Sequence, residues 1–388
     1  MDKNTIIGFV LIAALLIGFS WYTQPSEEDI AKQHMQDSIT ALAKKKAEES
    51  RNAEAQASNQ NAQNNVNADT TAVFYKSLSG KAQNIILKNS KLELTLSTKG
   101  GTVEKAVIKD FKDNKGNKDL TLFDSKDQSL KFMLEGKETN IITSDLYFTP
   151  SNITDSTVTM TAVGSNGRSL VMNYKLGKNY LLHFSLKANG MSGLFSPNYN
   201  KLDIEWTDHC RQQEKGFTFE NRYASLTYHF TDGGTDYISE TSEKVDEKIE
   251  DAIDWVAFKN QFFSAVMIAK DDLGTNSLMT SIPQEKGSGY LKQYGAKVKT
   301  SFDPTGNNST ELEFYYGPND FRLLQKIEKE STFNKDLELH RLVYLGWPLF
   351  RIINRWFTLY VFDWLTGLNI NMGIVLILIT LLLKVITY

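Results

Sequence analysis

A lysine near the C-terminus is the residue whose surroundings point most directly to chemistry. Lys384 follows the apolar run from Met372 to Leu383, so it lies about 18 Å along a helix that starts at Met372. An ammonium at that depth in a hydrocarbon layer costs a few kcal/mol unless water or a partner reaches it. Thr380, Lys384 and Tyr388 are spaced by four residues and share one helix face. This stripe is expected on a helix that has one side facing a hydrated cavity within the membrane. In the alternative interpretation, the Lys384 side chain extends to the cytoplasmic lipid headgroups.

An amphipathic helix is predicted over residues 341–362, before that apolar run. On a helical wheel an apolar face lies opposite a face that carries Arg351 and Arg355. Trp347 and Trp356 lie in the same segment, and the membrane interface favours tryptophan and arginine. We expect this helix to lie along the outer membrane surface; packing on the neighbouring domain is the alternative.

The rest of the chain offers weak candidates for chemistry. Four titratable side chains are close in sequence: Asp203, Glu205, Asp208 and His209. Their spacing matches no metal motif, and we interpret them as a solvated strand edge. The basic and aromatic stretch Lys215–Tyr223 is interpreted as an ordinary surface strand, with contact to a sugar or peptide as the alternative. Cys210 is the single cysteine, which excludes an internal disulfide, and we interpret it as buried and inert. We predict no enzyme, no metal and no cofactor.

The composition excludes several classes of protein. The 388 residues are 41% hydrophobic and 23% charged, which fits neither a multi-span transporter nor a disordered protein. The formal net charge of −3 gives no indication of nucleic-acid binding.

An N-terminal membrane anchor is predicted over residues 1–25. Residues 4–24 are uncharged and can cross a hydrocarbon layer roughly 30 Å thick. A cleaved signal peptide is the alternative, but no small-x-small site follows the apolar run. Lys3 precedes the span and acidic residues follow it, which places the N-terminus in the cytoplasm and the rest outside.

A polar tether (26–72) and a β domain (73–330) come next. Leu92–Leu96 and residues 180–187 alternate between apolar and polar side chains, as half-buried strands do. Residues 311–316 alternate in the same way, with Glu311, Glu313 and Tyr315 on the second face. Many short runs with glycine and asparagine turns indicate an antiparallel sandwich, and residues 321–330 an amphipathic helix packed on its end.

A second span is predicted to begin at Met372. Residues 372–388 are at the short limit for crossing a bilayer. We therefore expect the sequence to be a C-terminally truncated piece of a longer protein.

Several stretches in this order resemble the YidC/Oxa family of membrane protein insertases, of the Gram-negative type with a large periplasmic domain. The stretches are Ser97–Glu104, Trp255–Ala265, Phe314–Pro318, Trp347–Phe350 and Ile377–Lys384. The similarity extends over nearly the whole chain, and the tether is shared only in kind.

The resemblance implies a galactose-mutarotase-like β-supersandwich in the periplasm, between two transmembrane helices of the inner membrane. It also implies a hydrophilic intramembrane groove in which Lys384 takes the place of the family's usual arginine, with Thr380 and Tyr388 as neighbours. The implied partners are nascent membrane proteins, the lipid bilayer and the Sec translocon, with the ribosome reached only through regions absent here.

Two functions other than insertion are left open by the residues. One is a membrane-tethered domain that binds or modifies carbohydrate, which would bind a sugar and be indifferent to the C-terminal span. The other is a scaffold that docks a secretion channel and inserts nothing itself.

Overall fold

The computed structural model describes residues 73–238, 244–344, 357–368 and 370–387. The predicted anchor (1–25) and tether (26–72) lie outside these residues. The strands are β1 (Asn84–Lys88), β2 (Leu92–Ser97), β3 (Val103–Lys112), β4 (Lys118–Phe123), β5 (Gln128–Leu134), β6 (Ile141–Ile142), β7 (Thr149–Ser151), β8 (Thr157–Val163), β9 (Ser169–Leu176), β10 (Leu181–Asn189), β11 (Lys201–Arg211), β12 (Ser225–Phe230), β13 (Thr235–Tyr237), β14 (Val245–Ile249), β15 (Ile253–Lys259), β16 (Phe263–Ala269), β17 (Ser277–Pro283), β18 (Tyr290–Ser301) and β19 (Thr310–Pro318). The helices are α3 (Phe217–Arg222), α4 (Phe321–Glu330), α6 (Leu359–Thr366) and α7 (Met372–Thr387), with short 3-10 turns that include η4 (Ser192–Leu194) and η5 (Leu339–Leu342).

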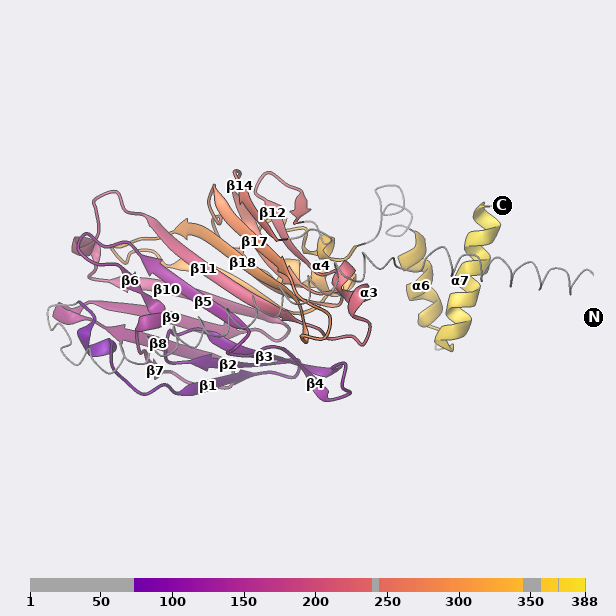
Figure 1. Ribbon diagram of the computed structural model, residues 1–388, viewed down its shortest axis with the longest axis horizontal. Coiled ribbons are helices and arrows are strands. Elements are labelled where there is room, and N and C mark those ends of the chain that lie inside the picture. The colour runs from indigo at the N-terminus through magenta and orange to yellow at the C-terminus, as the bar shows by residue number, and fades with distance from the viewer. Residues whose placement is uncertain (1–72, 239–243, 345–356, 369, 388) are drawn as a thin grey trace, which may run out of the picture. The chain divides into compact units, whose positions relative to one another are not determined.

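The strands form three antiparallel sheets (Figure 1). One sheet has the order β1-β2-β3-β4, a second β13-β12-β15-β16-β19-β10-β9-β8-β7, and a third β14-β17-β18-β11-β5-β6. Many neighbours are hairpins, and Gly116 at the tip of β3–β4 has the positive φ of +84° that such turns favour in glycine. The predicted antiparallel β-sandwich is confirmed.

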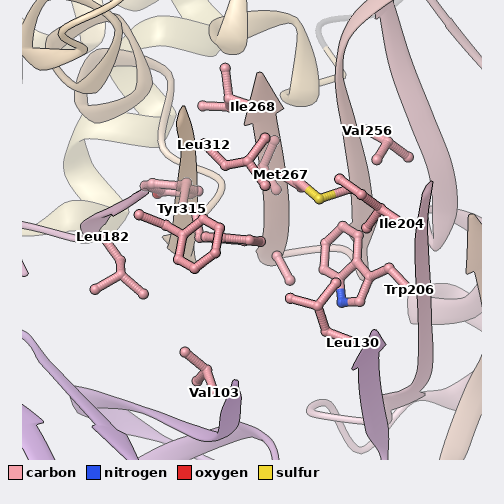
Figure 2. Packing of buried hydrophobic residues seen from close by; sticks show 14 of the residues in the cluster. Val103, Leu130, Leu182, Ile204, Trp206, Val256, Met267, Ile268, Leu312 and Tyr315 are labelled. Atoms are coloured by element: carbon pink, nitrogen blue, oxygen red, sulfur yellow. The ribbon is translucent and has the colours of Figure 1, made fainter. Parts of the chain in front are cut away.

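The sheets pack on each other around a common core (Figure 2). Trp206 of β11 stacks on Phe258 of β15 with ring centroids 4.0 Å apart, which joins the six-stranded sheet to the nine-stranded sheet. Phe123 of β4 meets Tyr316 of β19 at 5.3 Å, so the four-stranded sheet packs on the nine-stranded sheet as well. Each large side chain buried in this way contributes about 1.5–3 kcal/mol to folding.

Two of the three predicted alternating segments behave as expected. The strand β2 buries every second residue from Leu92 to Leu96, and β10 does so from Leu182 to Leu186. Polar residues at the positions between them keep some contact with solvent. These strands therefore follow the period of two that the sequence shows.

The strand β19 departs from that pattern because both of its faces are covered. Glu313 and Tyr315, on the face expected to be polar, are fully buried. The segment after α4 covers this face, and Thr332 donates hydrogen bonds to Glu313 Oε1 from its backbone N (2.9 Å) and its hydroxyl (2.8 Å). His183 Nδ1 lies 3.0 Å from the same carboxylate oxygen. The prediction that only one face of β19 is buried was therefore wrong.

The helix α4 has the bounds that the sequence predicts. Asp320 caps its N-terminus by accepting a hydrogen bond from Leu323 N at 2.7 Å. Phe321, Leu324 and Ile327 form its buried face. This amphipathic helix packs on the common core, as expected.

The segment after α4 is held on the nine-stranded sheet by Trp255 of β15. The buried indole Nε1 donates a 2.7 Å hydrogen bond to the carbonyl of Leu337. The backbone N of Leu337 in turn donates to Glu328 of α4 at 3.0 Å. These bonds connect α4, the segment after it and the sheet.

The stretch Lys215–Tyr223 was predicted to be a surface strand, and this prediction was wrong. It contains α3, preceded by a loop that the side chain of Glu220 closes. The Glu220 carboxylate accepts hydrogen bonds from the backbone N of Gln213 (3.0 Å) and of Glu214 (2.9 Å). These local bonds outweigh the strand preference of the aromatic residues.

Burial also changes the acidity of Glu220. Loss of solvent raises its pKa from the ordinary 4.5 to about 7, although the two backbone donors act in the opposite direction. The folded state therefore favours the protonated carboxyl. This contribution to stability is complete below pH 4.5 and is lost as the pH rises to about 7.

We expect Glu220→Gln to remove this loss, because glutamine keeps an acceptor for the backbone N–H groups and cannot ionise. The denaturation midpoint of the variant should change less between pH 5 and pH 8 than that of the wild type. Glu138→Gln, at an exposed position in another part of the domain, is the control and should keep the wild-type pH dependence. An unchanged pH dependence in Glu220→Gln would show that folding does not raise the pKa of Glu220.

We expect Trp255→Phe to lower the free energy of unfolding by about 1–3 kcal/mol, because it leaves the buried carbonyl of Leu337 without its donor. Urea denaturation followed by circular dichroism measures this. The control Trp364→Phe changes an exposed indole of α6 and should shift the free energy by less than about 0.5 kcal/mol. Equal effects of the two variants would contradict the assigned role of the hydrogen bond.

Candidate functional site

The helix α7 carries the two described members of the predicted stripe, Thr380 and Lys384. Asn371 begins the helix, since its side chain accepts a hydrogen bond from Gly373 N at 2.8 Å. Thr380 Oγ1 donates a 2.7 Å hydrogen bond to the carbonyl of Leu376, so its hydroxyl is satisfied within the helix. The side chains of Thr380 and Lys384 both lie on the helix surface.

The helix α6 packs on one side of α7. Leu365 of α6 is buried against Val375 and Ile379 of α7, with Leu383 partly buried beside them. The packed positions of α7 are spaced by four residues. Thr380 and Lys384 each come one residue later, about 100° further around the helix. The predicted stripe therefore lies beside the α6–α7 contact and leaves it apolar.

Most of the remaining surface of α7 is apolar and exposed. The exposed apolar residues are Met372, Ile374, Leu376, Ile377, Leu378, Leu381, Leu382 and Val385. Contiguous apolar surface of this kind marks contact with lipid or with another protein. The arrangement is a hydroxyl and an ammonium side by side on a helix that is otherwise suited to a hydrophobic environment.

Several predicted residues lie outside the described part of the chain. These are Tyr388 of the stripe and Trp347, Arg351, Arg355 and Trp356 of the predicted interfacial helix. At the ends of the predicted helix 341–362, residues 341–342 belong to the turn η5 and residues 359–362 to α6. Where the structure describes the chain, it contains no helix with both the length and the apolarity that a membrane span needs.

A contact missed by sequence reasoning connects α4 to α6. The Arg322 guanidinium lies 3.1 Å from Asp363 Oδ2 and 5.0 Å from the ring centre of Tyr360. In water such an exposed pair contributes at most about 1 kcal/mol, so its role is positional. The available signal was an aspartate one helical turn after a tyrosine in an otherwise apolar segment.

The four titratable residues of β11 do not form a joint site. Asp203 and Glu205 face the partly exposed side and pair across the strand with Lys299 (2.9 Å) and Lys297 (4.0 Å). Asp208 faces the core, where burial raises its pKa well above the ordinary value. His209 is on the Asp203 side of the strand. Since β11 pairs with both β18 and β5, the interpretation as a strand edge was wrong.

Cys210 is buried, as interpreted, and burial raises the pKa of its thiol well above the ordinary value. A thiol of this kind reacts slowly because the thiolate is the reactive form. Within the described ranges, no group of three or more histidine, cysteine or carboxylate side chains is placed to hold a metal ion.

Two hollows in the β domain were not predicted. One has a volume of about 350 Å³ and is lined by His183 and Glu313 with residues of β8 and β9. The other, of about 510 Å³, contains His229, Asp254 and Lys335. Lys335 Nζ lies 2.6 Å from Asp254 Oδ1 in this second hollow. In each hollow a charged pair is thus formed between lining residues: His183 with Glu313 and Lys335 with Asp254.

Comparison with solved structures finds similarity at low sequence identity. A galactose mutarotase-like protein from Lactobacillus casei is 11% identical with a TM-score of 0.39, covering 61% of this chain and 100% of that one. A galactose mutarotase related enzyme from Lactobacillus acidophilus is 9% identical with a TM-score of 0.37, covering 60% and 97%. No inference about the fold or about sugar chemistry rests on this similarity.

Closer relatives align along the chain. The membrane protein insertase YidC of Phocaeicola vulgatus is 48% identical over 390 residues, covering 100% of this chain and 62% of that protein. The membrane protein insertase YidC of Bacteroides fragilis is 41% identical over 391 residues, covering 100% of this chain and 62% of that protein. The chain thus spans about three fifths of the length of these relatives. The YidC periplasmic domain family matches residues 84–360, which is more than half of the sequence, and the chain therefore belongs to the YidC family.

Proposed function

We propose that the protein helps nascent proteins insert and fold in the bacterial inner membrane, alone or with the Sec translocon. Two observations support this. The relatives that align along the whole chain are named membrane protein insertases. Thr380 and Lys384 form a polar stripe on the apolar helix α7, and the stripe is the observation that carries the mechanism.

The stripe lowers the barrier for moving hydrophilic parts of a substrate into the bilayer. Moving the polar or acidic segments beside the apolar segment of a substrate into hydrocarbon has a large desolvation cost. A hydrated groove beside Lys384 shortens the dry part of the path, and the ammonium attracts negative charge. The apolar segment of the substrate then moves sideways into lipid, driven by its transfer from water. This mechanism requires no nucleotide and no cofactor.

The position of the stripe supports a groove that opens beside α6. Since α6 covers the neighbouring face of α7 through Leu365, a substrate reaches Lys384 from the side that α6 leaves open. The exposed apolar residues around the stripe, such as Leu381 and Val385, then face lipid or further helices. Because the surfaces on either side of the stripe are apolar, water reaches the Lys384 ammonium only along the stripe.

Lysine in this position is chemically different from arginine. A lysine ammonium can lose its proton when desolvated, whereas a guanidinium stays charged. The proposed groove must therefore keep Lys384 hydrated in order to keep it charged. Arginine is expected to serve the same role with less dependence on water.

The proposed organisation follows the sequence. Residues 1–25 anchor the chain with the N-terminus in the cytoplasm, 26–72 form a tether, and 73–330 form the periplasmic domain. Residues 341–362 lie at the membrane surface, where Trp347, Arg351, Arg355 and Trp356 contact the headgroups. Residues 372–388 begin the second span, with Tyr388 beside Lys384 and Thr380 in the groove. The arrangement leaves the sandwich outside the membrane.

We expect Lys384→Ala to reduce insertion of a single-span substrate with an acidic flank by tenfold or so, since one charge contact of about 1.4 kcal/mol corresponds to that factor. Lys384→Arg should retain most activity. The assay measures protease protection of the substrate in cells depleted of their own insertase and supplied with the full-length protein.

Val385→Ala is the matched control, because Val385 is the next residue and is highly exposed. It should insert the substrate as well as the wild type does. Full activity of Lys384→Ala would exclude an electrostatic role for the lysine.

A further inference from the structure

Three aromatic side chains lie together around α3, two of them exposed and Tyr223 partly buried. Phe219 of α3 is 56% exposed, and its ring lies 5.4 Å from that of Tyr223. Tyr223 lies 6.2 Å from Tyr344, which is 53% exposed. Burying these rings in the core would be favourable, yet the fold leaves them at the surface. An exposed aromatic cluster of this kind marks a contact surface.

Basic side chains are present on α3, just before it, and on a hairpin bonded to the preceding loop. The β3–β4 hairpin carries the exposed lysines Lys112, Lys115 and Lys118. Lys215 precedes α3, and Arg222 is the last residue of that helix. The acidic side chains of these segments are Asp113, Asp119 and Glu214, together with the buried Glu220. Exposed basic residues therefore predominate here, although the chain as a whole has a net charge of −3.

The segments are bonded to one another. Asn114 Nδ2 at the hairpin tip donates a 2.9 Å hydrogen bond to the carbonyl of Gln212, just before α3. The backbone N of Gln212 donates to Gly289, between β17 and β18, at 2.9 Å. Figure 1 shows α3 and the β3–β4 hairpin at the same end of the sandwich. We call residues 112–118, 215–223 and Tyr344 the basic-aromatic end.

We propose that the basic-aromatic end docks on the surface of an anionic phospholipid bilayer. Tyrosine and other aromatic rings favour the headgroup layer. Each nearby lysine or arginine adds attraction to anionic lipid. The combination of exposed aromatic and basic side chains thus matches this surface in both respects.

The course of the chain supports a bilayer as the occupant. Tyr344, a member of the aromatic cluster, is followed by the segment that leads into α6 and α7. The exposed apolar surface of α7 requires cover by lipid or protein. The bilayer of this inference is the one that the proposed function assigns to α7, so the inference rests on that location. Docking would hold the sandwich at a fixed orientation above the groove.

Single-cysteine labelling tests the proposal, because the native Cys210 is buried and unreactive. Thr218→Cys places an environment-sensitive fluorophore on α3 and leaves the aromatic rings intact. The protein is reconstituted in vesicles of phosphatidylethanolamine and phosphatidylglycerol that contain spin-labelled lipid. Collisional quenching by that lipid reports contact with the bilayer. We expect several-fold stronger quenching at position 218 than at a distant position on the sandwich.

Two further label positions serve as controls. Ser192→Cys is in η4, before β11 begins, and α3 follows the end of β11, so the length of that strand, roughly 35 Å, separates the two labels. Leu381→Cys, at a residue 54% exposed on α7, reports whether that helix is in the membrane. Quenching at positions 381 and 218 but not at 192 supports docking.

The other outcomes contradict the proposal in different ways. Quenching at 381 alone overturns docking and leaves the proposed function intact. Quenching at none of the positions overturns both, because α7 would then lie outside the bilayer. A label at 218 that is shielded from water without being quenched indicates a protein contact instead, and also overturns docking.

Charge variants separate attraction to anionic lipid from simple proximity. Combined Lys112→Glu, Lys115→Glu and Lys118→Glu should reduce quenching at position 218 to the level of position 192, as should vesicles of phosphatidylcholine alone. Lys201→Glu, an exposed lysine at the start of β11, is the control and should have no effect. Unchanged quenching in the triple variant would overturn the electrostatic part of the proposal.

Discussion

The cost of placing a charge beside apolar surface is the constraint on which the rest of this account depends. The helix α7 exposes leucine, isoleucine and valine side chains on most of its surface, and a lysine on the same surface is tolerated in hydrocarbon only if water reaches it. The packing of α6 on the adjoining face leaves the Thr380–Lys384 stripe open. The proposed insertion mechanism is a direct use of that constraint, because a path that keeps lysine hydrated also hydrates a polar substrate segment.

A series of side-chain contacts leads from the β domain to this helix pair. Its core joins three sheets, and bonds from Trp255 and Glu328 hold the segment that follows α4. Arg322 then connects α4 to α6 through Asp363 and Tyr360. These contacts form a series from the core of the sandwich, through α4, to the helix that packs on α7. Docking of the basic-aromatic end would add a second attachment to the membrane.

Local patterns were sufficient to predict a large part of this fold. The alternation in β2 and β10 and the helical period of α4 are each written within a few residues, and the structure follows them. The same reasoning failed for β19, because the segment that buries Glu313 comes from beyond α4.

Predictions that depended on remote or side-chain bonds were less successful. The helix α3 replaced an expected strand because Glu220 bonds to the backbone of Gln213 and Glu214, a contact that hydrophobic periodicity does not contain. The Arg322–Asp363 contact joins residues far apart in sequence, and the local signal at Tyr360 and Asp363 does not identify Arg322 as the partner. For the candidate site, the sequence identified Thr380 and Lys384 as one face of a helix, and their relation to α6 required the packing of Leu365.

Water access along the stripe is the most direct test of the central claim. Single cysteines at positions 380, 381, 384 and 385, in the membrane-embedded full-length protein, would be treated with a charged thiol reagent that reacts only in water. The account predicts rapid modification at 380 and 384 and protection at 381 and 385. Protection at 384, or equal modification at all four positions, would contradict a hydrated face on an otherwise lipid-covered helix.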